Sequence, residues 1–162
     1  MYDYNDIRTL HLEITEKCNA ACPMCARNIN GGEDNPWLQN AELSLNDIVT
    51  IFPDTFIQQL NHMFMCGNYG DPIVAKDTLK VFKHFRSVNP TIYLSMNTNG
   101  SARTTYWWKE LAEVIGTDGY VIFSIDGLED TNYLYRKNTT WDKIMENAGS
   151  FIDAGGIAHW EY

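Results

Sequence analysis

Long apolar runs, positive charge and cysteine are all scarce in this sequence of 162 residues. No apolar run approaches the roughly 18–20 residues that a helix needs to cross a bilayer, so we do not expect a membrane protein. The chain has 12 Lys and Arg residues against 21 Asp and Glu, a formal net charge of −9. Because nucleic acids and anionic membranes are also negative, this balance argues against a general binder of either.

The first six residues, MYDYND, lack the basic and apolar regions of a signal peptide. We therefore expect a reducing, cytoplasmic setting, in which the four cysteines serve metal binding or catalysis rather than disulfide bonds. The length fits one domain, with enough buried surface for a hydrophobic core.

Apolar periodicity predicts strands that alternate with helices, which indicates βαβ units and an α/β fold with a parallel sheet. Residues 119–125 are apolar enough to form a strand buried on both faces. Polar and glycine-rich segments follow the strands, where parallel α/β folds bind their ligands. We expect strands at residues 7–14, 62–66, 91–96, 119–125 and 157–162, and helices at residues 45 to about 53, 76–88, 106–115 and 140–154.

Three of the cysteines lie close together, directly after the first predicted strand, as Cys18, Cys22 and Cys25 in C-N-A-A-C-P-M-C. Thiolates clustered on one loop are typical ligands of iron–sulfur clusters. Structural zinc usually takes four protein ligands in two separated pairs, and no fourth Cys or His is near in the sequence. Three ligands leave one metal position open for a small molecule. Two alternatives stay open: a zinc site completed by Cys66 or a histidine, and three unligated core cysteines.

The C-x3-C-x2-C loop resembles the hallmark of the radical S-adenosylmethionine (SAM) enzymes. Three further segments, each after a predicted strand, are similar to motifs of that family. Gly70-Asp71-Pro72 resembles the G-G-E-P motif, with Tyr69 in place of its first glycine and Asp71 in place of its glutamate. Residues 97–100 (N-T-N-G) resemble a T-N-G element, and residues 124–127 (S-I-D-G) resemble an S-x-D-G element. The sequence around the cysteines is most similar to that of members that carry a C-terminal SPASM or twitch extension.

The resemblance implies a partial parallel (β/α) barrel, with the cofactor across the C-terminal ends of the strands. The complete family core has six βα units. We expect residues 1–162 to be the N-terminal part of this core domain, with about four βα units and the start of a fifth. The last strands and any SPASM or twitch extension would then be absent, in keeping with an end inside an apolar run.

The resemblance also implies the cofactors. Cys18, Cys22 and Cys25 would bind three irons of a [4Fe–4S] cluster, and the fourth iron would bind the methionine end of SAM. A glycine turn permits close backbone approach to a ligand, and a planar guanidinium suits a carboxylate. Met24 stands where the family usually has an aromatic residue beside the adenine. We expect SAM contacts from Met24, Asn68, Gly70, Asp71, Asn97, Ser124 and Arg136.

By the same resemblance, the expected function is that of a radical SAM enzyme. Reductive cleavage of SAM by the cluster yields a 5′-deoxyadenosyl radical, which abstracts hydrogen from a peptide or small-molecule substrate. A flavodoxin-like or ferredoxin-like protein would supply the electron. The alternatives are a non-catalytic metal-binding module, holding zinc or a structural iron–sulfur cluster, and an inactive radical SAM fragment. Cys66 is interpreted as a small core residue rather than a ligand.

Overall fold

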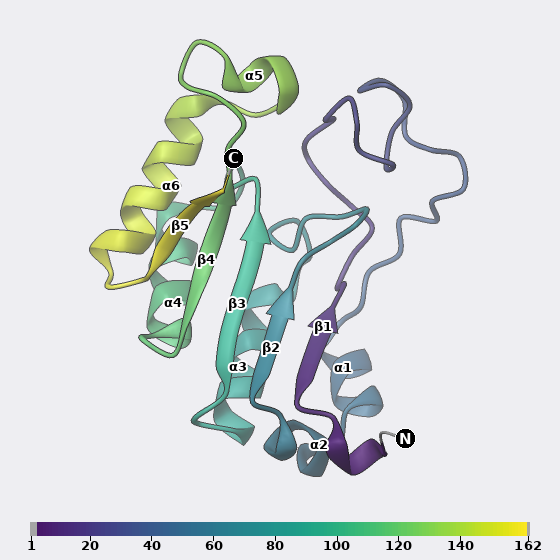
Figure 1. Cartoon of the computed structure of the whole chain (residues 1–162), viewed down its shortest axis with the longest axis vertical. Helices are drawn as coiled ribbons and strands as arrows, with labels where there is room; N and C mark the ends of the chain where they lie inside the picture. The colour runs from purple at the N-terminus through teal and green to yellow at the C-terminus, as the bar shows by residue number, and fades with distance from the viewer. Residues whose placement is uncertain (1–2, 162) are drawn as a thin grey trace.

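The computed structural model describes residues 3–161 and has one sheet of five parallel strands in the order β1-β2-β3-β4-β5. Neighbouring strands in the sequence are therefore neighbours in the sheet, as expected of a barrel wall built from consecutive βα units (Figure 1). This confirms the predicted α/β fold with a parallel sheet. The strands are β1 (Thr9–Leu12), β2 (His62–Met65), β3 (Tyr93–Thr98), β4 (Gly119–Ser124) and β5 (Ala158–Glu161).

Most of the helices lie against one face of this sheet, whereas the short α5 lies beyond the C-terminal ends of the strands (Figure 1). The longer ones pack in sequence order, α3 against α4 and α4 against α6. They are α1 (Leu45–Ile51), α2 (Asp54–Gln59), α3 (Thr78–Val88), α4 (Thr105–Ile115), α5 (Asn132–Tyr135) and α6 (Trp141–Asp153), and a short 3-10 helix spans Tyr4–Asp6. No helix of residues 3–161 is long and apolar enough to span a bilayer.

The opposite face of the sheet carries half-buried side chains, which corrects the prediction for residues 119–125. In β4, Val121 and Phe123 are buried, whereas Tyr120, Ile122 and Ser124 are only partly covered. Successive side chains of a strand point to opposite faces, so this alternation marks one covered face and one open face. The apolar composition of the strand does not reveal this difference.

The helices begin and end largely where local chemistry predicts. Ser44 and Asp47 form the expected capping box at the start of α1. Gly155, with φ +90°, follows α6 as the predicted stop. The short helices α2 and α5 were not predicted, because segments of six and four residues give too little periodicity. Strand β3 also extends two residues beyond the prediction, so that Asn97 belongs to the strand rather than to the turn.

The core lies between the sheet and the helices and centres on Trp108 of α4. Its side chain is completely buried, with ring centroids 5.3 Å from Phe123 and 6.3 Å from Phe151. The indole Nε1 donates to the carbonyl oxygen of Ala102 at 3.0 Å. One residue thus joins α4, β4 and α6 and also ties down the segment that follows β3.

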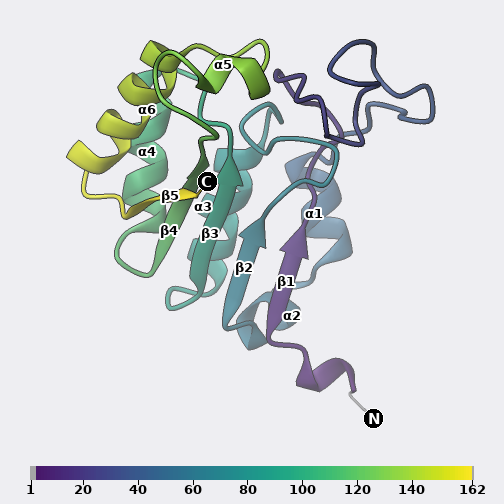
Figure 2. The same ribbon diagram turned by 45° about the horizontal axis from the view of Figure 1, so that its top comes forward.

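Because the strands are parallel, the loops that follow them gather beyond the C-terminal ends of the strands (Figure 2). The long segment between β1 and α1 lies at one side of this end, and α5 with its flanking loops lies at the other. Backbone contact joins them directly, since Ala21 N donates to the carbonyl oxygen of Lys137 at 3.0 Å.

We expect Trp108→Ala to lower the free energy of unfolding by about 3–5 kcal/mol, because it leaves a large cavity in the core and removes one hydrogen bond to the carbonyl oxygen of Ala102. Urea denaturation of the metal-free protein measures this loss. The matched control is Tyr106→Ala on the same helix, where the side chain is 69% exposed and the change should stay within about 0.5 kcal/mol. Equal urea midpoints for the two variants would contradict the assignment of Trp108 to the centre of the core.

Candidate iron–sulfur and SAM site

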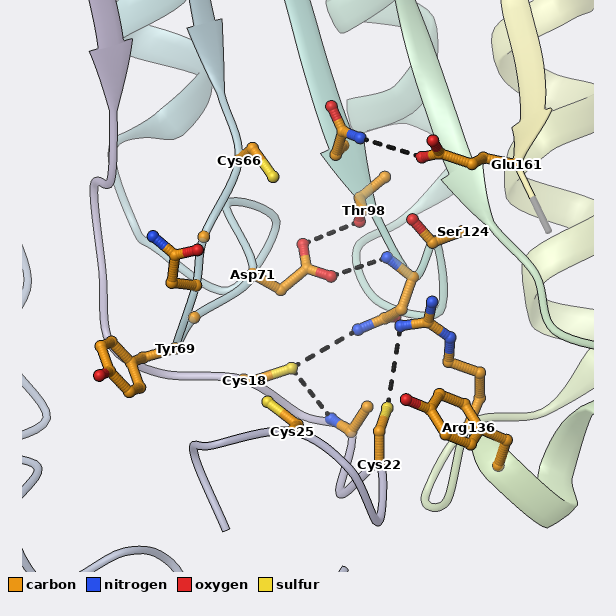
Figure 3. Close-up of a pocket in the computed structure, with 17 residues that line it drawn as sticks. Cys18, Cys22, Cys25, Cys66, Tyr69, Asp71, Thr98, Ser124, Arg136 and Glu161 are labelled. Atoms are coloured by element: carbon orange, nitrogen blue, oxygen red, sulfur yellow. Dashed lines mark hydrogen bonds between the residues drawn. The ribbon is translucent and has the colours of Figure 1, made fainter.

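A pocket of about 310 Å³ lies where the ends of β2, β3, β4 and β5 meet the cysteine loop. All three motif cysteines line it (Figure 3). The structure also brings to this pocket six of the seven residues expected to contact SAM: Asn68, Gly70, Asp71, Asn97, Ser124 and Arg136. Segments up to 118 residues apart, from Cys18 to Arg136, thus meet in one hollow.

Met24 is the exception, because the structure turns it away from the pocket. Cys25 N donates to the carbonyl oxygen of Cys22 at 3.0 Å, which closes a tight turn with Pro23 and Met24 at its corner. The Met24 side chain is 86% exposed and is not among the described residues that line the pocket. The expected contact with the adenine is therefore not present in this arrangement of the loop.

The cysteine loop is held in place by Arg27, which is almost completely buried. Its guanidinium donates to the carbonyl oxygen of Glu16 and forms an ion pair with Asp34 at 2.7 Å. A planar guanidinium can bind several acceptors in fixed directions. Arg27 thereby anchors both arms of the loop around the cysteines.

Each motif sulfur accepts a hydrogen bond from nitrogen. Backbone Ala20 N lies 3.4 Å from Cys18 Sγ, and backbone Arg27 N lies 3.5 Å from Cys25 Sγ. Arg136 Nη1 lies 3.8 Å from Cys22 Sγ. Donors directed at sulfur favour the anionic thiolate, which is the form that binds metals.

Burial acts in the opposite direction on two of these thiols. It raises the pKa of Cys18 to about 12, with a further contribution from the negative charge of Asp71. Burial also raises the pKa of Cys22. The protein alone therefore does not stabilise the thiolates at neutral pH, although it supplies donors for them. A bound cation resolves this conflict, because metal ligation deprotonates a thiol.

The arrangement suits a cluster better than a single ion. Among residues 3–161, no group of three or more Cys, His, Asp or Glu residues is close enough to hold one metal ion. A tetrahedral zinc site would need its sulfur atoms roughly 3.8 Å apart. In an iron–sulfur cluster each cysteine binds a different iron, so that the sulfurs lie farther apart. The three motif cysteines all line one open pocket, where each could bind a different iron of such a cluster.

The turn after β2 is pressed against the base of the cysteine loop. A Cβ atom at Gly70 would overlap the carbonyl oxygen of Thr15, so only glycine allows this approach. In the next residue, Asp71 N donates to the carbonyl oxygen of Lys17 at 2.9 Å. Asn68, at the start of the turn, donates through its backbone and its side chain to Glu13.

Asp71 connects this turn to the end of β3. Its carboxylate accepts from Thr98 Oγ1 at 2.8 Å, Asn99 N at 2.8 Å and Ile73 N at 3.1 Å (Figure 3). Burial raises the pKa of this carboxyl group, and the three hydrogen bonds oppose the rise. Asp71 thus borders the pocket, but both of its oxygens are already occupied by protein donors.

Arg136 follows α5 and reaches back over the cysteines. Its Nε donates to Asp126, the carboxylate of the S-I-D-G segment, and its guanidinium carbon lies 5.6 Å from the Tyr135 ring centroid. The side chain is thereby fixed on two sides, with further N–H groups at the pocket wall. Such an arginine can bind a ligand carboxylate.

Cys66 and Glu161 are among the lining residues that were not expected at the site from the sequence. Cys66 was expected in the core, but it is half-buried and lines the pocket. It follows His62 and Phe64 at spacings of two, and this period would have placed it on the open face. Glu161 at the end of β5 also lines the pocket, and Asn97 Nδ2 donates to it at 3.4 Å. Only the strand register, which pairs Glu161 with Ser124, brings it there.

The chain is similar in sequence to a known protein family and to a characterised protein. The model of the radical SAM superfamily matches residues 12–159. A tungsten-containing aldehyde ferredoxin oxidoreductase cofactor-modifying protein from Pyrococcus furiosus is 30% identical over 122 residues, which are 75% of this chain and 32% of the relative. The chain thus spans about a third of that relative's length.

Solved structures share the fold. Native anSMEcpe with bound AdoMet superposes with a TM-score of 0.72 at 21% identity, over 94% of this chain and 42% of that chain. BtrN in complex with AdoMet and 2-DOIA gives a TM-score of 0.60 at 13% identity, over 95% of this chain and 56% of that chain. Since the family model matches nearly the whole chain, the protein belongs to the radical SAM superfamily, a family of enzymes.

We expect alanine at Cys18, Cys22 or Cys25 to abolish cluster assembly, because each change removes one of only three protein ligands. Anaerobic reconstitution with iron and sulfide, followed by iron and sulfide analysis, measures the effect. Cys66→Ala is the matched control and should keep the full iron content of the unmodified protein. A loss of iron in Cys66→Ala as well would show that the fourth cysteine is a ligand.

Proposed function

We propose that this chain binds a [4Fe–4S] cluster through Cys18, Cys22 and Cys25 and binds SAM beside it, to start radical chemistry on a substrate. The observation that carries the proposal is the convergence of three cysteines and six further expected residues on one pocket. Membership of the radical SAM superfamily supports it. When bound, the cluster and SAM supply a 5′-deoxyadenosyl radical that abstracts hydrogen, and the protein contributes placement and exclusion of water.

Different residues of the chain would bind different chemical groups of SAM. The free N–H groups of Arg136 suit the carboxylate of its methionine end. The turn at Asn68 and Gly70 provides acceptors for the amino group, since a carbonyl oxygen and an amide oxygen can both accept from it. Ser124, at the end of β4, suits the ribose or the carboxylate, and Asn97 lies on the neighbouring strand. Asp71 fixes the end of β3 beside the pocket through its hydrogen bonds to Thr98 and Asn99.

We propose a peptide or a small metabolite as the substrate. The support comes from two structural neighbours, one described as native anSMEcpe with bound AdoMet and Cp18Cys peptide and the other as BtrN with 2-DOIA. These likenesses are at 21% and 13% identity and concern the fold. A flavodoxin-like or ferredoxin-like donor in a reducing compartment such as the cytoplasm would supply the electron.

The test is anaerobic reconstitution, reduction, and electron paramagnetic resonance with and without SAM. We expect four irons per chain and a cluster signal that changes on adding SAM, because SAM binds the iron that has no protein ligand. Formation of 5′-deoxyadenosine under reducing conditions then reports cleavage. A protein that binds zinc instead, or a cluster that ignores SAM, would favour a non-catalytic metal-binding module and reject the proposal.

We expect Arg136→Ala to keep the cluster but weaken SAM binding by about 2–5 kcal/mol, because it removes the partner of a carboxylate in a partly buried site. Titration of the cluster signal with SAM measures the change. Arg8→Ala is the matched control, since Arg8 is exposed and precedes β1 at the far end of the sheet. Unchanged SAM affinity in Arg136→Ala would exclude the carboxylate contact.

A further inference from the structure

A partly buried network of side-chain amides and hydroxyls contacts Cys18, and its centre is Asn99. This residue follows β3 and is 3% exposed. Its Nδ2 lies 3.7 Å from Cys18 Sγ and donates to Asn19 Oδ1 at 3.0 Å. One of its two N–H groups is thus directed at a motif sulfur, whereas the other is held by the cysteine loop itself.

The orientation of this amide is determined by its partners. Asn99 Oδ1 accepts from the backbone nitrogen of Ser101 at 2.9 Å and from the hydroxyl of Ser101 at 2.6 Å. That hydroxyl in turn accepts from Asn19 Nδ2 at 2.8 Å. If the Asn99 amide were flipped, its oxygen would face Asn19 Oδ1 and the sulfur, and its NH2 group would face two donors. Only the orientation with N–H toward Cys18 satisfies every member of the network.

The backbone of Asn99 is fixed separately by Asp71. Asn99 N donates to Asp71 Oδ2, and Thr98 Oγ1 donates to Asp71 Oδ1, both at 2.8 Å. Thr98 Oγ1 also accepts from Gly100 N at 3.0 Å, where the backbone turns with φ +70°. The carboxylate therefore sets the position of the turn that presents the amide to the sulfur.

We propose that Asn99 tunes the reduction potential of the cluster through its N–H···S hydrogen bond to Cys18, and that Asp71 is a positioning residue that acts through Asn99. This inference rests on the proposed function only as far as cluster binding. Reduction of the cluster by one electron adds negative charge that the sulfur ligands share. A donor directed at the sulfur stabilises that charge, so that the hydrogen bond raises the potential and eases reduction.

The experiment measures the midpoint potential of the reconstituted cluster in an anaerobic redox titration followed by electron paramagnetic resonance, without SAM. Asn99→Ala should keep four irons per chain and shift the potential to a more negative value. Asn99→Asp, which has nearly the same shape, should shift it further, because it places a carboxylate oxygen against the sulfur. Asn61→Ala is the matched control, an exposed asparagine just before β2, and should leave the potential unchanged.

Asp71→Asn tests the positioning role. In either orientation its amide places NH2 opposite one backbone N–H, of Asn99 or of Ile73, so that one hydrogen bond is lost. We expect a smaller shift in the same direction. In the Asn99→Ala background, Asp71→Asn should add no further shift, because it acts through the missing amide. A shift that adds fully in the double variant would overturn this part of the proposal.

The outcomes separate this inference from the proposed function. An unchanged potential in both Asn99 variants, with the cluster present, overturns the inference and leaves the proposed function intact. Loss of iron in both variants overturns it as well, since Asn99 would then serve assembly rather than tuning. A cluster that ignores SAM but responds to Asn99 rejects the proposed function and supports the inference. An unmodified protein that assembles no cluster rejects both.

Discussion

The buried carboxylate of Asp71 is the interaction on which the geometry of the pocket depends. It accepts three hydrogen bonds, one from the last residue of β3, one from the residue that follows β3 and one from its own turn after β2, while its backbone nitrogen donates to the carbonyl oxygen of Lys17 in the cysteine loop. Removing such an acceptor leaves buried donors unpaired, which costs more than the bond itself contributes. The hydrogen bonds of Asp71 thereby fix the relative positions of the three loops that carry the proposed ligands. The close packing of Gly70 against the backbone of Thr15 also holds the turn after β2 against the cysteine loop.

The parallel sheet explains why these loops meet at all. Because every strand runs in the same direction, the segments that follow them emerge at one end, and strand pairing brings Met65 beside Met96 and Ser124 beside Glu161. The helices cover one face of the sheet (Figure 1), and the pocket lies between the strand ends and the cysteine loop. The covered face thus holds the hydrophobic core, with residues such as Trp108, and the C-terminal end of the sheet holds the proposed site.

The sequence predicted the fold well, and the positions of side chains less well where they depend on tertiary register. The spacing of the three cysteines predicts a cluster, and the order of strands and helices predicts the parallel sheet that the structure shows. The directions in which side chains point were harder to predict from the sequence. Whether Asp71 faces the ligand or the protein depends on where the end of β3 lies, and Met24 points outward because of a turn closed between Cys22 and Cys25. Glu161 joins the pocket through pairing with a strand that lies 37 residues earlier, at Ser124.

Two opposed influences act on the thiols of the cysteine loop, namely burial and hydrogen-bond donors directed at sulfur. Burial keeps the pKa of Cys18 at about 12, far above neutral pH, although nitrogen donors surround its sulfur. Donors of this kind contribute most to an anion, and a neutral thiol uses them poorly. The site is therefore built for a state that arises when a cation replaces the proton. Binding of the proposed cluster would release protons and strengthen the hydrogen bonds from Asn99 and Arg136 together, so that the free energy of ligation would also stabilise the loops around the pocket.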